Sequence, residues 1–294
     1  MENPAEGAGG FDVAQYYADY PRKVIARPGY PARAAYKSYL AWREFGKVLL
    51  AQGGDVQTVA DVGGCFGFGL NAFLYHGNRI LGHEMKGDLY ELGESFRQIG
   101  RMLFPHITFY AHNFATSELP RPYDVTLLFD VLEHMPDVQH FLDQARHRTR
   151  FAIIKTPLET TQRRERLAAA GKGEPYPSGE AHPDGHLHFF TLPMFLDMLR
   201  QYFDVCSVWI VPLRTTYHRK EIIIPESVDV AGIAGSRTPA ALSMRSLVRT
   251  LIRFTLPGLI PSVIRDRVDC ARVRLGLACG DAFVLARSPV TADG

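Results

Sequence analysis

Short apolar runs alternate with amphipathic stretches from residue 58 onward, and this alternation constrains the fold more than any other feature of the sequence. The apolar runs predict strands at residues 58–62, 79–84, 107–112, 124–129, 151–155, 205–211 and 282–286. Helical patterns lie between most of them, at residues 67–75, 88–103, 137–146 and 192–203. Strands that alternate with helices form parallel sheets with helices on both faces. We therefore expect an α/β fold with a Rossmann-like, seven-stranded, mostly parallel sheet.

The predicted elements divide the 294 residues into three parts. Residues 1–54 form an N-terminal accessory segment that contains a helix at residues 32–52. The sheet takes residues 55–211 and returns for its last strand within residues 280–290. Between these two stretches, residues 212–279 are an arginine-rich helical insertion.

The four cysteines are widely spaced, and no two of them form a Cys-x-x-Cys pair. This spacing disfavours both a cysteine zinc site and a disulfide framework, and it is typical of a reducing compartment. The net charge of +2 gives no indication of nucleic-acid binding. The first ten residues are polar, and no apolar run approaches the roughly 20 residues that span a bilayer. We expect a cytoplasmic protein, with peripheral membrane contact left open.

A glycine-rich turn from Asp61 to Gly69 joins the first predicted strand to the helix after it. Glycine permits the sharp bend and lets a ligand approach the backbone without meeting a Cβ atom. The glycine spacing departs from the Gly-x-Gly-x-x-Gly of dinucleotide-binding turns. A carboxylate at Asp61 suits a positively charged amino group better than a pyrophosphate. Glu84 ends the next predicted strand, about 20 residues on, where an acidic side chain accepts hydrogen bonds from ribose hydroxyls.

Residues 59–69 resemble the first motif of the class I S-adenosylmethionine-dependent methyltransferases: an apolar strand, Asp-x-Gly and further glycines. One departure is Cys65, which stands where that family usually has its middle glycine. The resemblance implies that S-adenosylmethionine is the cofactor, with its methionine part against the turn and its ribose on the acid that follows. The cofactor ligands expected in this region are Asp61, Gly63, Gly67 and Glu84.

Asn113 and Phe114 follow the predicted strand at residues 107–112, at the place where such enzymes contact adenine. The resemblance implies that the Asn113 side-chain carbonyl accepts a hydrogen bond from the adenine amino group, and that Phe114 packs on the ring. A turn asparagine and a core phenylalanine explain the same two residues equally well.

Asp130-Val-Leu-Glu133-His134 ends an apolar strand with three ionisable groups, which are costly to bury. The stretch resembles the fourth motif of the same family, in the subset that acts on small molecules, and Asp130 is expected among the cofactor ligands. Two further stretches, residues 151–157 and 185–192, resemble later parts of these enzymes. No Asn/Asp-Pro-Pro-Tyr/Phe pattern is present, which disfavours methylation of DNA bases.

Methyl transfer depends largely on positioning the acceptor against the methyl group, and a hydroxyl acceptor also benefits from a general base. Histidine suits that role near neutral pH. We expect His134 first and His186 second as catalytic residues, since both lie on loops at the expected ligand edge. A rival interpretation is that Glu133, His134 and a loop histidine ligate a divalent ion. Because no further acidic pair has clear ligand spacing, we expect no metal.

Arginines recur at positions 245, 249 and 253 of the insertion, with apolar residues between them. This pattern predicts a basic amphipathic helix, followed by a second arginine-rich stretch that extends the basic region to residue 274. The helix either packs on the core with its arginines solvated, or contacts an anionic membrane surface or a phosphate-bearing lipid carrier.

The motifs in their order favour an S-adenosylmethionine-dependent methyltransferase that acts on a small-molecule, glycan or lipid-linked acceptor, and we expect methylation at oxygen. The alternative is a catalytically silent partner subunit that binds the cofactor. A nicotinamide oxidoreductase would need the dinucleotide glycine spacing, which the turn lacks.

Overall fold

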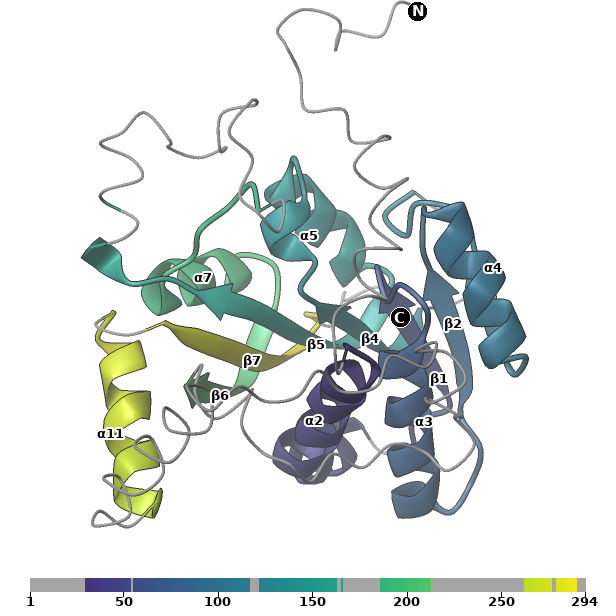
Figure 1. Ribbon diagram of the computed structural model, residues 1–294, viewed down its shortest axis with the longest axis horizontal. Coiled ribbons are helices and arrows are strands. Elements are labelled where there is room, and N and C mark those ends of the chain that lie inside the picture. Colours follow the sequence, from purple (N-terminus) through teal and green to yellow (C-terminus); the bar gives the residue numbers. More distant parts are fainter. Residues whose placement is uncertain are drawn as a thin grey trace, which may run out of the picture.

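The computed structural model describes residues 30–53, 55–116, 122–162, 165, 186–212, 262–276 and 279–289. Within these residues the chain forms one seven-stranded sheet (Figure 1). Its strands are β1 (Thr58–Val62), β2 (Lys86–Tyr90), β3 (Ile107–Tyr110), β4 (Tyr123–Phe129), β5 (Thr149–Leu158), β6 (Asp204–Pro212) and β7 (Gly280–Arg287).

The strand order in the sheet is β3-β2-β1-β4-β5-β7-β6. β1 pairs in parallel with both β2 and β4, and β5 continues the parallel part. β7 lies antiparallel between β5 and β6. The predicted fold class, a Rossmann-like and mostly parallel sheet, is confirmed. Because the order reverses between β1 and β4, the carboxyl ends of these two strands form the switch point where such sheets bind ligands.

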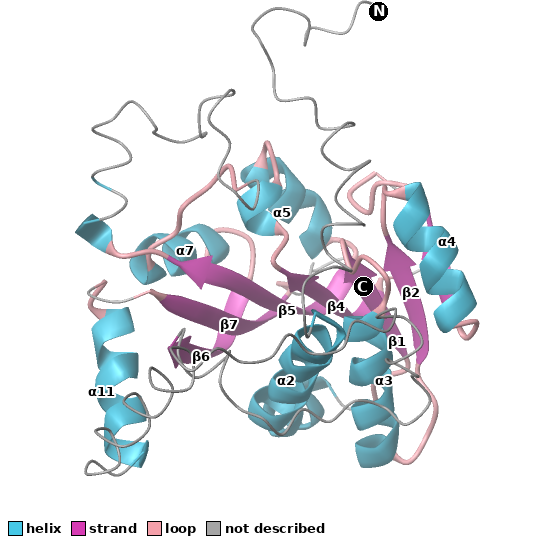
Figure 2. Ribbon diagram, in the orientation of Figure 1, coloured by secondary structure: helices cyan, strands magenta, loops and turns pink. Residues whose placement is uncertain are grey.

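Helices cover both faces of the sheet (Figure 2). On one face lie α2 (Tyr30–Gly53), α3 (Phe68–Leu81) and α4 (Glu94–Leu103), whose apolar side chains share a core with one face of the strands. On the other face lie α5 (Val138–Arg146) and α7 (Leu192–Leu199), which share a second core with the opposite strand residues. α2 is part of the α/β core: Trp42 donates to the carbonyl of Phe73 at 2.8 Å, which joins α2 to α3.

The predicted strand at residues 79–84 is wrong, and so is the start of the predicted helix at residues 88–103. Residues 79–81 complete α3, which ends where Gly82 adopts φ 76° and donates its N–H to the Asn78 carbonyl. β2 follows at Lys86–Tyr90, and α4 begins only at Glu94. A left-handed glycine is a common way to end a helix, and because α3 continues to this point, the second strand lies six to seven residues further along the chain than predicted.

Most of the arginine-rich insertion, including positions 245, 249 and 253, lies outside the described residues, so the predicted amphipathic helix there stays a prediction. Its last part forms α11 (Ser262–Arg274), which lies beside β6 (Figure 1). Over the part of the chain that the structure describes, every helix is too short or too polar to cross a membrane.

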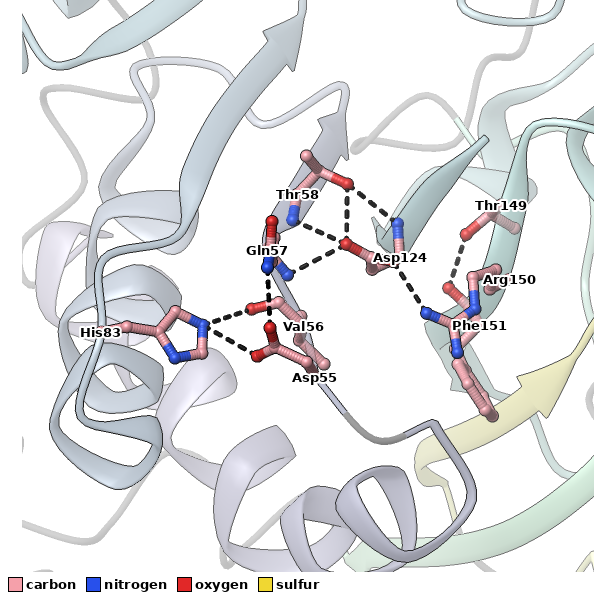
Figure 3. A network of polar contacts seen from close by, with 9 residues as sticks. All are labelled: Asp55, Val56, Gln57, Thr58, His83, Asp124, Thr149, Arg150 and Phe151. Atoms are coloured by element: carbon pink, nitrogen blue, oxygen red, sulfur yellow. Dashed lines mark hydrogen bonds and ion pairs between the residues drawn. The ribbon is translucent and has the colours of Figure 1, made fainter. Parts of the chain in front are cut away.

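A network of polar contacts joins β1, β4 and β5 at their amino ends (Figure 3). The carboxylate of Asp124 accepts hydrogen bonds from the backbone N–H groups of Gln57 and Thr58, both at 2.9 Å, and from Arg150 at 2.9 Å. Next to it, His83 lies 3.1 Å from the carboxylate of Asp55. These groups connect the amino ends of the strands, which lie on the side of the sheet opposite to the switch point.

Candidate functional site

The carboxyl ends of the five parallel strands, β1 to β5, lie on one side of the sheet, and hydrogen bonds connect several of the loops that leave them. The N–H of Gly63 donates to the Tyr90 carbonyl at 2.8 Å, which links the loops after β1 and β2. The N–H of Glu91 donates to the carbonyl of Tyr110, at the end of β3, at 3.0 Å. The glycine-rich turn after β1, Glu91 after β2 and the Asp130–His134 segment after β4 all lie on this side of the sheet.

The turn after β1 uses left-handed backbone at three positions. These are Gly63 (φ 67°), Cys65 (φ 52°) and Gly67 (φ 91°), and the last of them precedes α3 directly. A Cβ atom on Gly67 would lie 3.2 Å from the Phe109 ring, so packing against the core requires glycine there independently of any ligand. Cys65 has a conformation that favours glycine, which agrees with the residue that the resemblance expects at this position.

Asp61 is buried beneath this turn, with its side chain only 3% exposed. Burial and the neighbouring carboxylate of Glu91 raise its pKa to about 8, although Lys37 and the backbone N–H of Leu70 both favour the charged form. A Cβ atom on Gly64 would lie 2.1 Å from Oδ2 of Asp61, so glycine is required where the turn crosses the carboxylate. The site therefore holds a carboxyl group that a positive charge would stabilise.

Glu91, which directly follows β2, is the acid at this edge, and Glu84 is not. Glu84 precedes β2 and is exposed at the opposite edge of the sheet. The carboxylate of Glu91 accepts from the N–H of Cys65 at 3.2 Å and from the N–H of Gly93 at 2.7 Å. Burial raises its pKa despite these hydrogen bonds. The prediction that Glu84 ends the strand beside the turn is wrong because α3 is longer than its apolar pattern indicated.

Asn113 and Phe114 follow β3, as predicted, but the structure engages both side chains locally. Oδ1 of Asn113 accepts a hydrogen bond from the N–H of Ala115 at 2.9 Å, which closes a turn. Phe114 is 1% exposed and packs edge-on against Tyr90, with ring centroids 5.1 Å apart. Phe114 is therefore part of the core, and its predicted contact with adenine stays a prediction. Leu92, which follows Glu91 in the chain, is an apolar residue that is 67% exposed.

Asp130 directly follows β4 and has a left-handed conformation, with φ 55°, and two lysines contact its carboxylate. Lys37 reaches it from α2, and the buried Lys155 reaches it from β5. Lys155 also lies 2.8 Å from Asp281 on β7. Burial opposes the charge of Asp130, but Lys155 and then Lys37 hold its pKa below the usual range. The predicted cofactor ligand Asp130 is thus the centre of an ion-pair network that joins four elements.

Glu133 and His134 lie on the short 3-10 helix η1 (Leu132–His134), and the loop before α7 brings His186 to them. The imidazole rings of His134 and His186 are nearly perpendicular, with centroids 5.0 Å apart. Glu133 is fully buried, and burial together with the nearby Asp130 raises its pKa to about 8. His188 turns away from this group, and its Nε2 hydrogen-bonds to the Met135 carbonyl at 2.7 Å. The structure therefore brings the two predicted catalytic histidines together.

Sequence reasoning missed three of the residues at this edge: Glu91, Lys37 and Lys155. Gly82 was the available indication for Glu91, because a glycine after an apolar helix pattern marks the end of that helix. The two lysines had no local indication, since their partner Asp130 lies 93 and 25 residues away in the chain.

No known protein family and no curated protein matches the sequence. Among solved structures, coclaurine N-methyltransferase shares 13% identity with a TM-score of 0.49, over 85% of this chain and 72% of that one. Geranyl diphosphate C-methyltransferase from Streptomyces coelicolor shares 10% identity with a TM-score of 0.46, over 91% and 88% of the two chains. The [4+2]-cyclase SpnF shares 13% identity with a TM-score of 0.47, over 83% and 80%. Similarities this weak assign no function, which has to be argued from the site.

Proposed function

We propose that this chain is an S-adenosylmethionine-dependent methyltransferase that acts on a small-molecule, glycan or lipid-linked acceptor, preferably at oxygen. The observation that carries the proposal is the pair of buried carboxyl groups, Asp61 and Glu91, at the glycine-rich turn. The turn, both acids and the two histidines occur at the switch-point edge of a Rossmann-like sheet.

The two acids suit the chemical groups of S-adenosylmethionine. Asp61 has a pKa raised by burial, so an ammonium group beside it would restore the charged carboxylate. Glu91 already accepts one N–H at each oxygen, and each carboxylate oxygen can accept a second hydrogen bond. Two vicinal ribose hydroxyls would supply those donors. A phosphate beside Asp61 would keep that carboxyl protonated and would form no ion pair with it, which argues against a dinucleotide.

S-adenosylmethionine, when bound, supplies an electrophilic methyl group. The contribution of the chain is to hold the acceptor oxygen in line with that group and to exclude competing water. When the acceptor oxygen forms its new bond to carbon, the carbon–sulfur bond breaks and the hydroxyl proton must leave. His134 and His186 lie at the same edge and are the residues to which we assign activation of the acceptor hydroxyl.

The proposal is tested by calorimetric titration of the full chain with S-adenosylhomocysteine. We expect binding by the wild type and a loss of about 10-fold to 100-fold in affinity for Glu91→Gln, since one charge-assisted hydrogen-bond acceptor is weakened. Glu84→Gln is the matched control, because Glu84 is exposed at the opposite edge, and it should leave affinity unchanged. A wild-type protein that does not bind at concentrations well above micromolar would refute the proposal.

The acceptor is found by incubating cell extracts with the protein and isotopically labelled methyl donor, followed by mass spectrometry. A labelled product that disappears with His134→Ala would support the assignment of the site. Binding of S-adenosylhomocysteine without any labelled product would instead indicate a partner subunit that binds the cofactor without catalysis.

A further inference from the structure

We propose that Glu133, His134 and His186 form a binding site for a divalent cation of the zinc type. Each residue offers one ligand atom, and these three atoms lie within 4.8 Å of one another. Two of the ligands are adjacent on η1, and the third comes from a loop about 50 residues further along the chain. The fold therefore brings together a His₂Glu set that no local sequence pattern requires.

A second observation points to a cation independently of that clustering. Oε1 of Glu133 is buried and has no hydrogen-bond partner among the described residues. A buried carboxylate oxygen without a partner is costly, and proteins usually satisfy such atoms. A cation bound at this oxygen would supply the missing partner.

The surrounding structure holds the three ligands in place. The carbonyl of Glu133 accepts hydrogen bonds from the N–H of Leu187 at 2.7 Å and from the N–H of His188 at 3.1 Å, so the loop that carries His186 is fastened to η1. The hydroxyl of Thr156, on β5, donates to Oε2 of Glu133 at 3.2 Å. Partners of this kind orient metal ligands and raise metal affinity.

The donor set selects the type of ion. Two imidazoles and one carboxylate suit zinc, whereas magnesium and calcium prefer oxygen ligands alone. Zinc–ligand bonds of about 2.0–2.2 Å place donors roughly 3–4 Å from one another, so donors that lie within 4.8 Å would have to move closer by about 1 Å when the ion binds. Three protein ligands leave one position open, as in catalytic zinc sites.

An acceptor hydroxyl at the open position would have its pKa lowered by the ion, and its proton would pass to solvent before the oxygen is methylated. In the metal-loaded protein, His134 and His186 would therefore activate the acceptor hydroxyl through the ion that they hold, and in the metal-free protein they would act as general bases. This catalytic role depends on the proposed methyl transfer, but binding of the ion does not.

The test is calorimetric titration of the full chain with Zn²⁺ after treatment with a chelator, followed by absorption spectroscopy of the Co²⁺ form. We expect one tightly bound ion per chain and the visible absorption of four-coordinate Co²⁺. His134→Ala and His186→Ala should each lower affinity by about 100-fold or more, since loss of an outer partner alone costs about 10-fold to 100-fold. His140→Ala, exposed on α5, is the matched control and should change nothing.

Thr156→Val removes the hydroxyl that orients Glu133 and keeps the side-chain shape, so it should weaken Zn²⁺ by about 10-fold to 100-fold. Absence of tight binding in the wild type would overturn the proposal, and so would equal affinity in wild type, His134→Ala and His186→Ala. Neither titration contains a methyl donor. A chain that binds Zn²⁺ but not S-adenosylhomocysteine would therefore refute the proposed function and leave the metal site intact.

Discussion

Asp61 is the residue whose protonation links the turn to its proposed ligand. In the unfolded chain an aspartic acid has a pKa of about 3.9, whereas burial and Glu91 raise that of the folded chain to about 8. At neutral pH the free protein therefore carries Asp61 protonated. A bound ammonium group favours the carboxylate, so binding of S-adenosylhomocysteine should release a proton at this residue.

We predict that the affinity for S-adenosylhomocysteine rises from about pH 6 to about pH 8, by up to about tenfold per pH unit, and levels off above the pKa of Asp61. The proton released is measured by calorimetry in buffers of different ionisation enthalpy. Asp61→Asn keeps the shape and an acceptor for the Leu70 N–H, and it should remove both the proton release and this part of the pH dependence. Equal affinities at pH 6 and 8 would contradict the assignment.

The same substitution should make the free protein less sensitive to alkaline pH. A group whose folded pKa is raised contributes stability that is present below its unfolded pKa and is lost as pH rises through the folded value. For Asp61 this window extends from about pH 4 to about pH 8. Between pH 5 and pH 8, urea unfolding should therefore show a smaller loss of stability for Asp61→Asn than for the wild type. In the wild type, stability falls with rising pH, whereas affinity for S-adenosylhomocysteine rises.

At the scale of elements, the sequence predicted the alternating strands and helices because burial of strands in a parallel sheet leaves long apolar runs. It failed at α3 and β2. Ile80 and Leu81 read as a strand, but they extend the helix to the left-handed Gly82. β2 is short and contains Gly87 and a half-buried Asp88, so its own pattern is weak. Its position follows from pairing with β1, which no local pattern records.

The candidate site shows the same difference between features that a local pattern reveals and features that depend on long-range packing. The glycine-rich turn and the Asp130–His134 segment are contiguous in the chain, so their residue types revealed them. The contacts of Lys37 and Lys155 with Asp130 depend on how α2, β4 and β5 pack together. Because a short window of sequence does not record which distant elements pack together, these ion pairs could not be predicted from the sequence and are known only from the structure.

The two lysines on Asp130 belong to different elements and should differ in their contribution to stability. Lys155, on β5, is buried and contacts both Asp130 and Asp281, so Lys155→Met would leave buried carboxylates uncompensated and should cost about 3–5 kcal/mol. Lys37, on α2, is partly exposed, and Lys37→Met should cost about 1 kcal/mol or less. Urea unfolding checks both values. Combining Lys155→Met with Asp281→Asn should recover part of the loss, and additive losses would show that the pair is not coupled.

At the scale of the whole molecule, the two edges of the sheet use polar groups for different purposes. At the amino ends of the strands, the carboxylate of Asp124 accepts hydrogen bonds from backbone N–H groups and from Arg150 (Figure 3). These bonds hold the pKa of Asp124 below the usual range, although burial opposes its charge. At the carboxyl ends, Asp61 and Glu133 have raised pKa values because neighbouring groups do not offset the cost of their burial. Charge satisfied within the chain stabilises the fold, and charge left for a ligand costs stability.

This division predicts that stability and binding can be changed separately. Asp124→Asn weakens hydrogen bonds that join β1, β4 and β5, and should lower the free energy of unfolding at neutral pH by about 1–3 kcal/mol, which corresponds to a decrease in Tm of several degrees. Because the pKa of Asp124 is depressed, its contribution is present above about pH 4 and is lost as pH falls, so the difference between variant and wild type should shrink in acid. Affinity for S-adenosylhomocysteine should stay within about twofold of the wild type. Glu91→Gln should lose affinity with a smaller decrease in Tm than Asp124→Asn, because burial opposes the charge of Glu91 and its removal offsets part of the loss from the weakened hydrogen bonds. If Asp124→Asn reduced affinity as strongly as Glu91→Gln does, the two edges of the sheet would be coupled and the separation of their roles would be wrong.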